Sequence, residues 1–204
     1  MKNHMTVLCG DEKDSALPTH TPTRASNALS LRKTVIGGML VALTVALSGF
    51  SVPIGASRCF PIQHFINVIA GVFLGPVYGV AMAFCTSLIR NLMGTGSLLA
   101  FPGSMAGAFL GAFLFRKTGR FVLAYAGEII GTGIIGAMLC YPVATLVMGK
   151  EAAIFAYVIP FLMSTMCGTV IAAFLIGVLY KSGAFQYMRR MLDLDVQTGK
   201  AMGR

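Results

Sequence analysis

The strongest constraint in this sequence is a series of apolar segments with almost no acidic residue among them. Between residues 34 and 180 only Glu128 and Glu151 carry a carboxylate side chain. Apolar residues make up 56% of the chain and charged residues only 11%, whereas ordinary globular domains carry about 25% charged residues. A soluble protein of 204 residues could not bury so much apolar surface. We therefore expect an all-α membrane protein that crosses the bilayer several times.

Six segments are apolar enough to be expected as transmembrane helices. They are residues 34–50, 61–74, 77–92, 98–115 (interrupted around Pro102), 121–148 and 152–180. A straight span needs about 20 residues, so the second and third are expected to tilt or to contain irregular backbone that protein buries.

The basic residues predict which side of the membrane each connection occupies. With six spans and a cytoplasmic N-terminus, nine basic residues lie inside and three outside. The inside set is Arg24, Arg32, Lys33, Arg116, Lys117, Arg120, Lys181, Arg189 and Arg190, and the outside set is Arg58, Arg90 and Lys150. This bias follows the positive-inside rule and predicts that both termini are cytoplasmic. The same bias explains the net charge of +9, so this charge does not indicate a nucleic-acid-binding protein.

These boundaries divide the chain into three parts. Residues 1–30 are expected to be a disordered cytoplasmic tail, residues 31–182 a six-helix transmembrane domain, and residues 183–204 a cytoplasmic C-terminal tail. A five-span alternative would merge the second and third segments and place the basic residues at 116–120 outside, so it is disfavoured.

Polar residues gather toward the outer side. Gln63, His64 and Asn67 share one face of the second predicted helix, because residues three and four apart align on a helix. Polar groups in an apolar segment cost free energy unless they find partners. They either line a ligand site or hydrogen-bond neighbouring helices, and we favour the ligand site.

A second polar group follows the third segment. Arg90 and Asn91 precede the turn Gly94-Thr95-Gly96-Ser97. Such a turn can direct backbone N–H groups at an anion or a small polar ligand. A simple tight turn, with Arg90 anchored at the membrane interface, is the alternative.

Glu128 is the carboxylate placed deepest in an apolar segment, which makes it a functional candidate. It could pair with His64 or Arg90, accept a hydrogen bond from a ligand, or stay protonated, and Thr132 follows one helical turn further on. A purely structural ion pair is the alternative. Tyr141 and Ser164 either face the same cavity or serve in packing.

The first segment carries small residues at Gly38, Ala42 and Ala46. This spacing lets another helix approach closely, either within the chain or from a second subunit.

Motifs of several enzyme classes are missing. The sequence contains no phosphate-binding G-x-x-x-x-G-K-[ST], H-E-x-x-H or G-x-S-x-G pattern. Its five cysteines include no C-x-x-C pair, so no metal, cofactor or enzymatic activity is expected. One alternative is a small membrane enzyme acting on a lipid or prenyl group, with His64, Glu128 and Arg90 as acid, base and anion clamp. The other is a facilitator or channel that works alone.

Three strings of residues resemble the ThiW family, substrate-binding S components of energy-coupling factor (ECF) vitamin transporters. The first is Pro53-Ile54-Gly55-Ala56 and Arg58-Cys59-Phe60-Pro61 with Gln63, His64 and Asn67. The second runs from Arg90 to Ser104, and the third joins Gly127-Glu128 to Gly131-Thr132-Gly133. The resemblance covers roughly residues 32–180.

This resemblance implies a six-helix S-component bundle in a prokaryotic cytoplasmic membrane. The implied ligand is a thiamine precursor, hydroxyethylthiazole, and another small heterocyclic solute is the alternative. The implied partners are a transmembrane coupling subunit, two ATPase subunits and the lipid bilayer. Gly38, Ala42 and Ala46 match the docking stripe for the coupling subunit, with glycine in place of alanine at Gly38.

A thiazole would need aromatic contacts and two or three hydrogen bonds. Phe60, Phe101 and Tyr141 are candidates for the ring contacts, and Arg58 and Arg90 would hold a phosphate if the ligand carried one. The full predicted substrate-binding set is Arg58, Phe60, Gln63, His64, Asn67, Arg90, Asn91, Thr95, Ser97, Glu128, Thr132, Tyr141 and Ser164.

Overall fold

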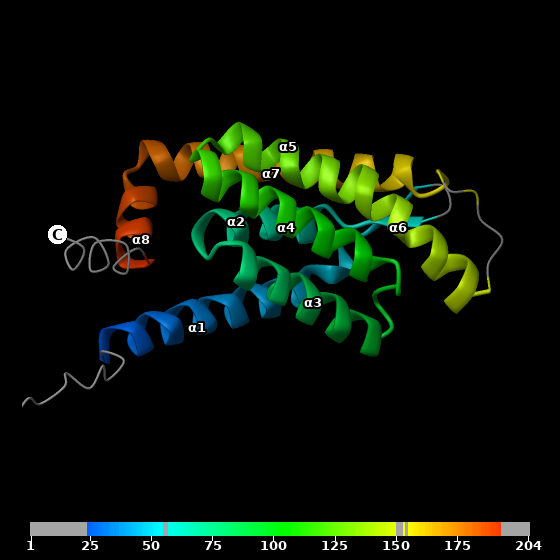
Figure 1. The fold of residues 1–204 in the computed structure, drawn as a ribbon, viewed down its shortest axis with the longest axis horizontal. Coiled ribbons are helices and arrows are strands. Elements are labelled where there is room, and N and C mark those ends of the chain that lie inside the picture. Colours follow the sequence, from blue (N-terminus) through cyan, green and yellow to red (C-terminus); the bar gives the residue numbers. More distant parts are fainter. Residues whose placement is uncertain (1–23, 55–56, 150–152, 154, 193–204) are drawn as a thin grey trace, which may run out of the picture.

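The computed structural model describes residues 24–54, 57–149, 153 and 155–192, which form an elongated bundle of helices (Figure 1). The helices are α1 Arg24–Ala46, α2 Pro61–Phe73, α3 Pro76–Leu92, α4 Ala100–Thr118, α5 Phe121–Ile130, α6 Ala137–Pro142, α7 Val158–Lys181 and α8 Ala184–Leu192. A 3₁₀ turn, η1 (Leu47–Gly49), ends α1, and the π-helical turns η2 (Gly131–Gly136) and η3 (Val143–Val147) continue α5 and α6.

The expected all-α class is confirmed within these ranges. Three helices are long and apolar enough to cross a membrane, namely Leu29–Gly49, Phe121–Val147 and Val158–Lys181. α2 is apolar but has only 13 residues, a length of about 20 Å. The count of six spans therefore stays a prediction.

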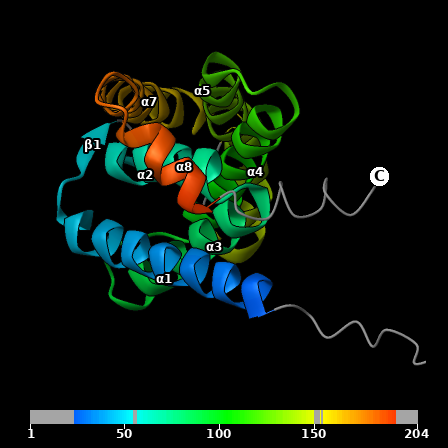
Figure 2. The same ribbon diagram turned by 90° about the vertical axis from the view of Figure 1, so that its left-hand side faces the viewer.

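α2 lies at the centre of the bundle, packed against α3, α4 and α7 (Figure 2). Pro61 begins the helix at a position where its missing N–H costs nothing. Gly75, with φ of +89°, turns the chain between α2 and α3, a backbone conformation that glycine adopts without strain. Ten of the 13 residues of α2 are buried, so any polar side chain on it must find its partners inside the protein.

Facing glycines bring α4 into backbone contact with α5 and η2. A Cβ atom on Gly131 would lie 2.7 Å from the Cα of Gly107, and one on Gly127 would lie 2.7 Å from the Cα of Gly111. Such close packing of small residues is typical of membrane helices. It presses Glu128 and Thr132 against α4.

Two connections differ from the expected pattern. The segment between the first two predicted spans forms a hairpin of β1 (Val52–Ile54) and β2 (Ser57–Cys59), in which Pro53 pairs with Arg58. The predicted interruption around Pro102 is wrong: α4 begins at Ala100 and continues through it. Proline is tolerated there because N–H groups in the first turn of a helix have no partner within the helix.

The ends of the predicted domains also contain helices. α1 begins at Arg24, within the segment expected to be a disordered tail, and α8 lies within the expected C-terminal tail. α7 begins at Val158, six residues after the predicted start of the last span. Residues 1–23 and 193–204 lie outside the described residues.

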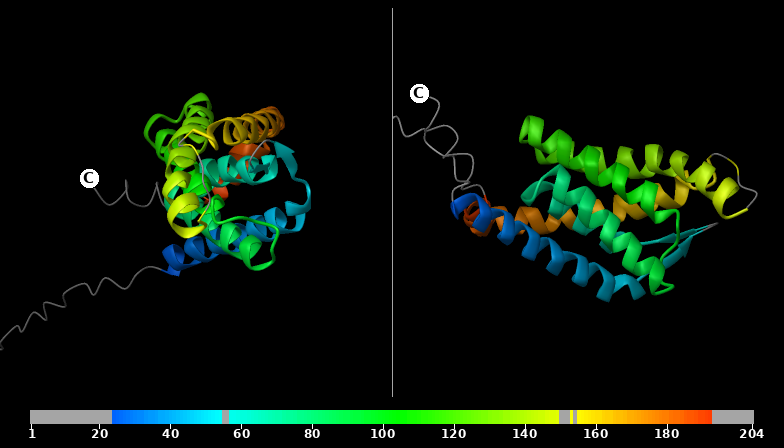
Figure 3. Two further views of the ribbon diagram at one scale, coloured as in Figure 1. Left: turned by 90° about the vertical axis from the view of Figure 1, so that its right-hand side faces the viewer. Right: turned by 60° about the horizontal axis from the view of Figure 1, so that its bottom comes forward.

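The two ends of the bundle differ in charge. α8, the start of α1 and the turn from α4 to α5 lie at one end, and the hairpin and the connection from α3 to α4 lie at the other (Figures 1 and 3). The first end carries the basic residues Arg32, Lys33, Arg116, Lys117, Arg120, Lys181, Arg189 and Arg190. At the hairpin end the described basic residues are Arg58 and Arg90.

Candidate functional site

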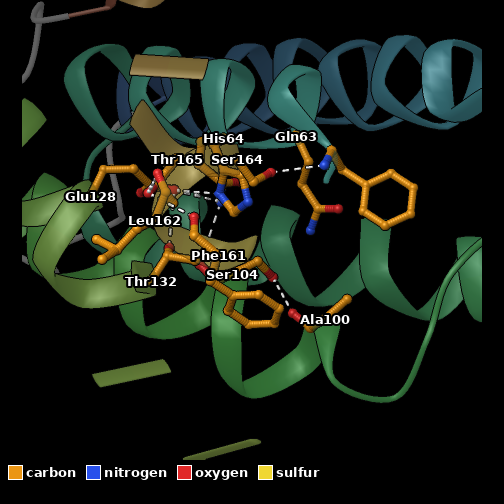
Figure 4. Close-up of polar contacts among 12 residues, drawn as sticks. Gln63, His64, Ala100, Ser104, Glu128, Thr132, Phe161, Leu162, Ser164 and Thr165 are labelled. Carbon is orange, nitrogen blue, oxygen red and sulfur yellow. Dashed lines mark hydrogen bonds and ion pairs between the residues drawn. The ribbon is translucent and has the colours of Figure 1, made fainter. Parts of the chain in front are cut away.

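A small polar cavity lies beneath the hairpin, where β2, α2, α4, η2 and α7 meet. Its volume is about 30 Å³, enough for one or two waters, since one water needs roughly 10–15 Å³. The lining residues are Arg58, Phe60, Gln63, His64, Ser97, Ala100, Ser104, Thr132, Phe161 and Ser164. In Figure 4 the side chains of His64, Ser104 and Thr132 lie together between the helices.

Glu128 is buried behind one wall of this cavity, with 1% of its surface exposed. His64 Nδ1 lies 3.0 Å from Glu128 Oε1. Asn67 Nδ2 and Thr132 Oγ1 donate to the same oxygen over 3.3 Å. Of the two partners expected for Glu128, the structure gives His64. These contacts tie α2 to α5 and η2, because a buried carboxylate needs several hydrogen-bond partners.

Arg90 of α3 is equally buried, at 1% exposure. Its Nη1 donates to Gln63 Oε1 and its Nη2 to the Thr95 carbonyl over 3.2 Å. The guanidinium carbon lies 3.8 Å from the centre of the Phe60 ring, a cation–π contact. Among the described residues no carboxylate pairs with Arg90, so it is held by neutral groups alone.

The turn after α3 folds back on the end of that helix at Arg90. The backbone N–H groups of Thr95 and Gly96 both donate to the Arg90 carbonyl over 2.9 Å. Thr95 Oγ1 donates to the same carbonyl over 3.3 Å. These bonds close the C-terminus of α3. They favour the alternative of a tight turn, and anion binding by the turn stays a prediction.

Hydrogen bonds connect the two buried charges through the cavity wall. Gln63 Nε2 donates to Ser87 Oγ over 3.4 Å, and Ser87 Oγ lies 3.2 Å from Ser104 Oγ. Asn67 Nδ2 reaches both the Ser104 carbonyl, over 3.4 Å, and Glu128. One polar network thus runs from Arg90 to Glu128, and it orders the side chains on the cavity wall.

The hairpin is attached to α7 at the mouth of the cavity. The Phe60 backbone N–H donates to Ser164 Oγ over 2.8 Å, and Cys59 Sγ donates to the Pro160 carbonyl over 3.1 Å. Burial, with a smaller effect from Cys167, raises the pKa of the Cys59 thiol, so the thiol keeps its proton and remains a donor.

The structure separates the predicted site residues into three groups. Seven line the cavity: Arg58, Phe60, Gln63, His64, Ser97, Thr132 and Ser164. Four lie behind its wall: Asn67, Arg90, Thr95 and Glu128. Asn91 and Tyr141 do not line it.

The aromatic contacts were predicted only in part. Phe60 lines the cavity, but Phe101 packs against Phe84 with 5.5 Å between ring centres. The second aromatic wall is Phe161 of α7, and Ser104 of α4 adds a hydroxyl; neither was singled out from the sequence. Within the described ranges, no group of three His, Cys, Asp or Glu side chains could hold a metal ion.

A second, apolar depression of about 760 Å³ lies on the outer surface between α1 and α3. Its lining includes the stripe Gly38, Ala42 and Ala46, together with Val41 and Met82. All three stripe residues are exposed, and a Cβ on Gly38 would meet nothing within 4 Å. The stripe is therefore not covered by other helices of the chain.

Comparison with protein families identifies a relationship over most of the chain. A family model described as thiamine-precursor transporter protein (ThiW) matches residues 34–182. The matched range contains the whole cavity and the stripe on α1. Neither the curated proteins nor the solved structures include a match to this chain.

Proposed function

Because the chain belongs to the ThiW family of thiamine-precursor transporters, we propose that it is the substrate-capture subunit of an ATP-driven ECF importer. Family membership makes it a membrane transport protein, which disfavours an enzyme acting on a lipid. In this proposal it binds hydroxyethylthiazole from outside a prokaryotic cell. A transmembrane coupling subunit and two ATPase subunits then drive delivery to the cytoplasm.

The observation that carries this proposal is the buried polar cavity near the hairpin end. Gln63, His64 and Thr132 are each at most 7% exposed and stand in an otherwise apolar bundle. Burying such polar groups costs free energy, and membrane helices can pack against each other without them. A small polar ligand explains why they converge on one space.

The chemistry of the cavity suits hydroxyethylthiazole. This ligand is uncharged and offers a ring nitrogen, a sulfur and one hydroxyl group. Phe60 and Phe161 provide aromatic walls, and Gln63 and His64 provide hydrogen-bonding groups. Pockets that hold drug-sized ligands measure roughly 300–1,000 Å³, so a cavity of about 30 Å³ must widen when the ligand enters. The segment made of the hairpin with Arg58 and of Phe60, which directly follows β2, is our candidate for the part that moves.

The charge distribution supports the proposed orientation in the membrane. The end with α8 and the turn from α4 to α5 carries most of the described basic residues, as cytoplasmic surfaces do. Six spans with both termini inside would then place the hairpin and the mouth of the cavity outside, where the substrate arrives.

Isothermal titration of the detergent-purified chain with hydroxyethylthiazole tests the proposed ligand. We expect nanomolar binding, about −12 kcal/mol, and weak binding of the aminopyrimidine precursor and of thiamine. If none of the three compounds gives a heat of binding, the assignment of hydroxyethylthiazole as the ligand is wrong. A different small heterocycle, found by mass spectrometry of the purified protein, would then replace it.

The stripe on α1 is proposed to dock on the coupling subunit. Ala42→Leu would fill the exposed apolar depression between α1 and α3, so we expect uptake into whole cells to be lost while binding by the purified chain is kept. Gly177→Leu, at an exposed position of α7 where a Cβ meets nothing within 4 Å, is the control and should retain both. Normal uptake by Ala42→Leu would contradict docking at this surface.

A further inference from the structure

We propose that the two buried charges, Arg90 and Glu128, act as positioning residues that fix the hydrogen-bonding direction of Gln63 and His64. The site then accepts an uncharged ligand that offers one acceptor and one hydroxyl donor. This inference rests on the proposed function, because it assumes that the cavity beneath the hairpin is the substrate site. Arg90 and Glu128 do not line that cavity, whereas Gln63 and His64 do.

Arg90 determines which end of the Gln63 amide faces the cavity. A guanidinium group only donates hydrogen bonds, so the Gln63 atom beside Arg90 Nη1 must be the amide oxygen. The amide nitrogen is then turned toward Ser87, where one N–H donates to Ser87 Oγ over 3.4 Å. The second N–H is free to donate to a ligand acceptor, such as a ring nitrogen.

Arg90 cannot readily change this arrangement. It is 1% exposed and held by the Thr95 carbonyl and by the Phe60 ring. Rotating the Gln63 amide by 180° would place its NH₂ group against the guanidinium and leave buried donors without acceptors, which is unfavourable. The amide therefore offers a donor to the cavity.

Glu128 determines the proton position on His64 in the same way. Asn67 and Thr132 both donate to Glu128 Oε1, so this oxygen serves as an acceptor toward His64 as well. His64 must then carry a proton on Nδ1, which lies 3.0 Å from that oxygen. The proposal takes the His64 ring as neutral. With its one proton on Nδ1, Nε2 is a hydrogen-bond acceptor. Figure 4 shows the imidazole between Glu128 and Gln63, where Nε2 can accept from a ligand hydroxyl.

The same geometry disfavours an anionic ligand. Arg90 and Glu128 both hold hydrogen bonds to protein groups. Arg90 Nε and Glu128 Oε2 are buried without a partner, but neither residue lines the cavity. Arg58 is the cation on the cavity wall, and it is exposed to solvent. A phosphate group drawn into the cavity would lose water without gaining a buried cation. The alcohol should therefore bind more tightly than its phosphate ester.

The sharpest test is Gln63→Glu. A carboxylate at this position still accepts from Arg90, so the fold should be kept, but it can no longer donate to a ligand. We expect hydroxyethylthiazole affinity, measured by titration calorimetry, to fall at least tenfold with no loss of thermal stability by circular dichroism. Gln186→Glu, on the exposed face of α8, makes the same charge change away from the cavity and should bind normally. Unchanged affinity in Gln63→Glu would overturn the proposal.

Ligand analogues separate positioning from a merely structural role. The wild-type chain should bind about tenfold or more weakly both the thiophene analogue, which lacks the ring nitrogen, and 4-methyl-5-ethylthiazole, which lacks the hydroxyl. In Arg90→Met the loss on removing the nitrogen should shrink below threefold, while sensitivity to the hydroxyl remains. In His64→Phe the loss on removing the hydroxyl should shrink below threefold, while sensitivity to the ring nitrogen remains. A structural role would weaken all three ligands in parallel, and that outcome would overturn the proposal.

Two results with wild-type protein keep the proposals distinct. If the chain binds no hydroxyethylthiazole, the proposed function fails at its ligand. If it binds the alcohol but binds the phosphate ester more tightly, or tolerates both deletions, the ligand site stands and the positioning roles of Arg90 and Glu128 are wrong.

Discussion

Replacing Glu128 by leucine is expected to abolish hydroxyethylthiazole binding and to lower the free energy of unfolding by about 3–5 kcal/mol. The carboxylate accepts from His64, Asn67 and Thr132 while only 1% exposed. Leucine removes this shared acceptor and leaves the three partners buried without it. His64 also loses the group that fixes its proton on Nδ1. Titration calorimetry and thermal circular dichroism in detergent measure the two effects; the chain has no tryptophan to report either by fluorescence.

Glu128→Gln is the conservative comparison. Its amide oxygen can still accept from the three partners, so it should unfold at a temperature between those of the wild type and Glu128→Leu. Its NH₂ group takes the place of Glu128 Oε2, which is buried without a hydrogen-bond partner. Wild-type stability in Glu128→Leu would show that the contacts around Oε1 contribute little to the fold.

The polar part of the site could be predicted because polar residues stand out in an apolar helix. Gln63, His64 and Asn67 fall on one face of α2 by spacing alone, and all three are buried. Glu128 is conspicuous as the one carboxylate far from the ends of the apolar segments. Each of these residues is costly to bury, so its presence in an apolar segment indicates that it has hydrogen-bond partners inside the protein.

The aromatic part could not be predicted by the same reasoning. Phe161 lines the cavity and Phe101 packs against Phe84, yet both are apolar residues in apolar helices. In a soluble protein the outward face of a helix is polar and identifies the inward face. Lipid is as apolar as the interior of the bundle, so that contrast is absent and the sequence does not say which phenylalanine points inward.

The glycines of α4 and α5 illustrate a different limit. The sequence predicts close helix packing at the stripe on α1, but a Cβ atom added to Gly38 would meet nothing within 4 Å. Helix backbones do approach closely where Gly107 faces Gly131 and where Gly103 faces Gly136. Small residues at helical spacing show that close approach is possible; which helix makes that approach depends on the whole bundle.

Gly107→Val should therefore be among the most destabilising single changes. A Cβ atom at this position would lie 1.9 Å from Thr132 Oγ1 and 3.0 Å from the Glu128 carboxyl group. Forcing atoms into a packed interior typically costs about 1–3 kcal/mol, and here the displaced groups also hold His64 in place. We expect a clearly lower unfolding temperature and loss of hydroxyethylthiazole binding.

Gly177→Val on α7 separates this packing effect from the helix propensity of the new residue. Both changes replace a helical glycine by the same β-branched residue, but a Cβ on Gly177 meets nothing within 4 Å. It should unfold near the wild-type temperature and bind normally. Equal unfolding temperatures for the two variants would mean that α4 can move away from η2 at little cost. In that case the backbone contact at Gly107 would not be what holds Glu128 and Thr132 against the cavity.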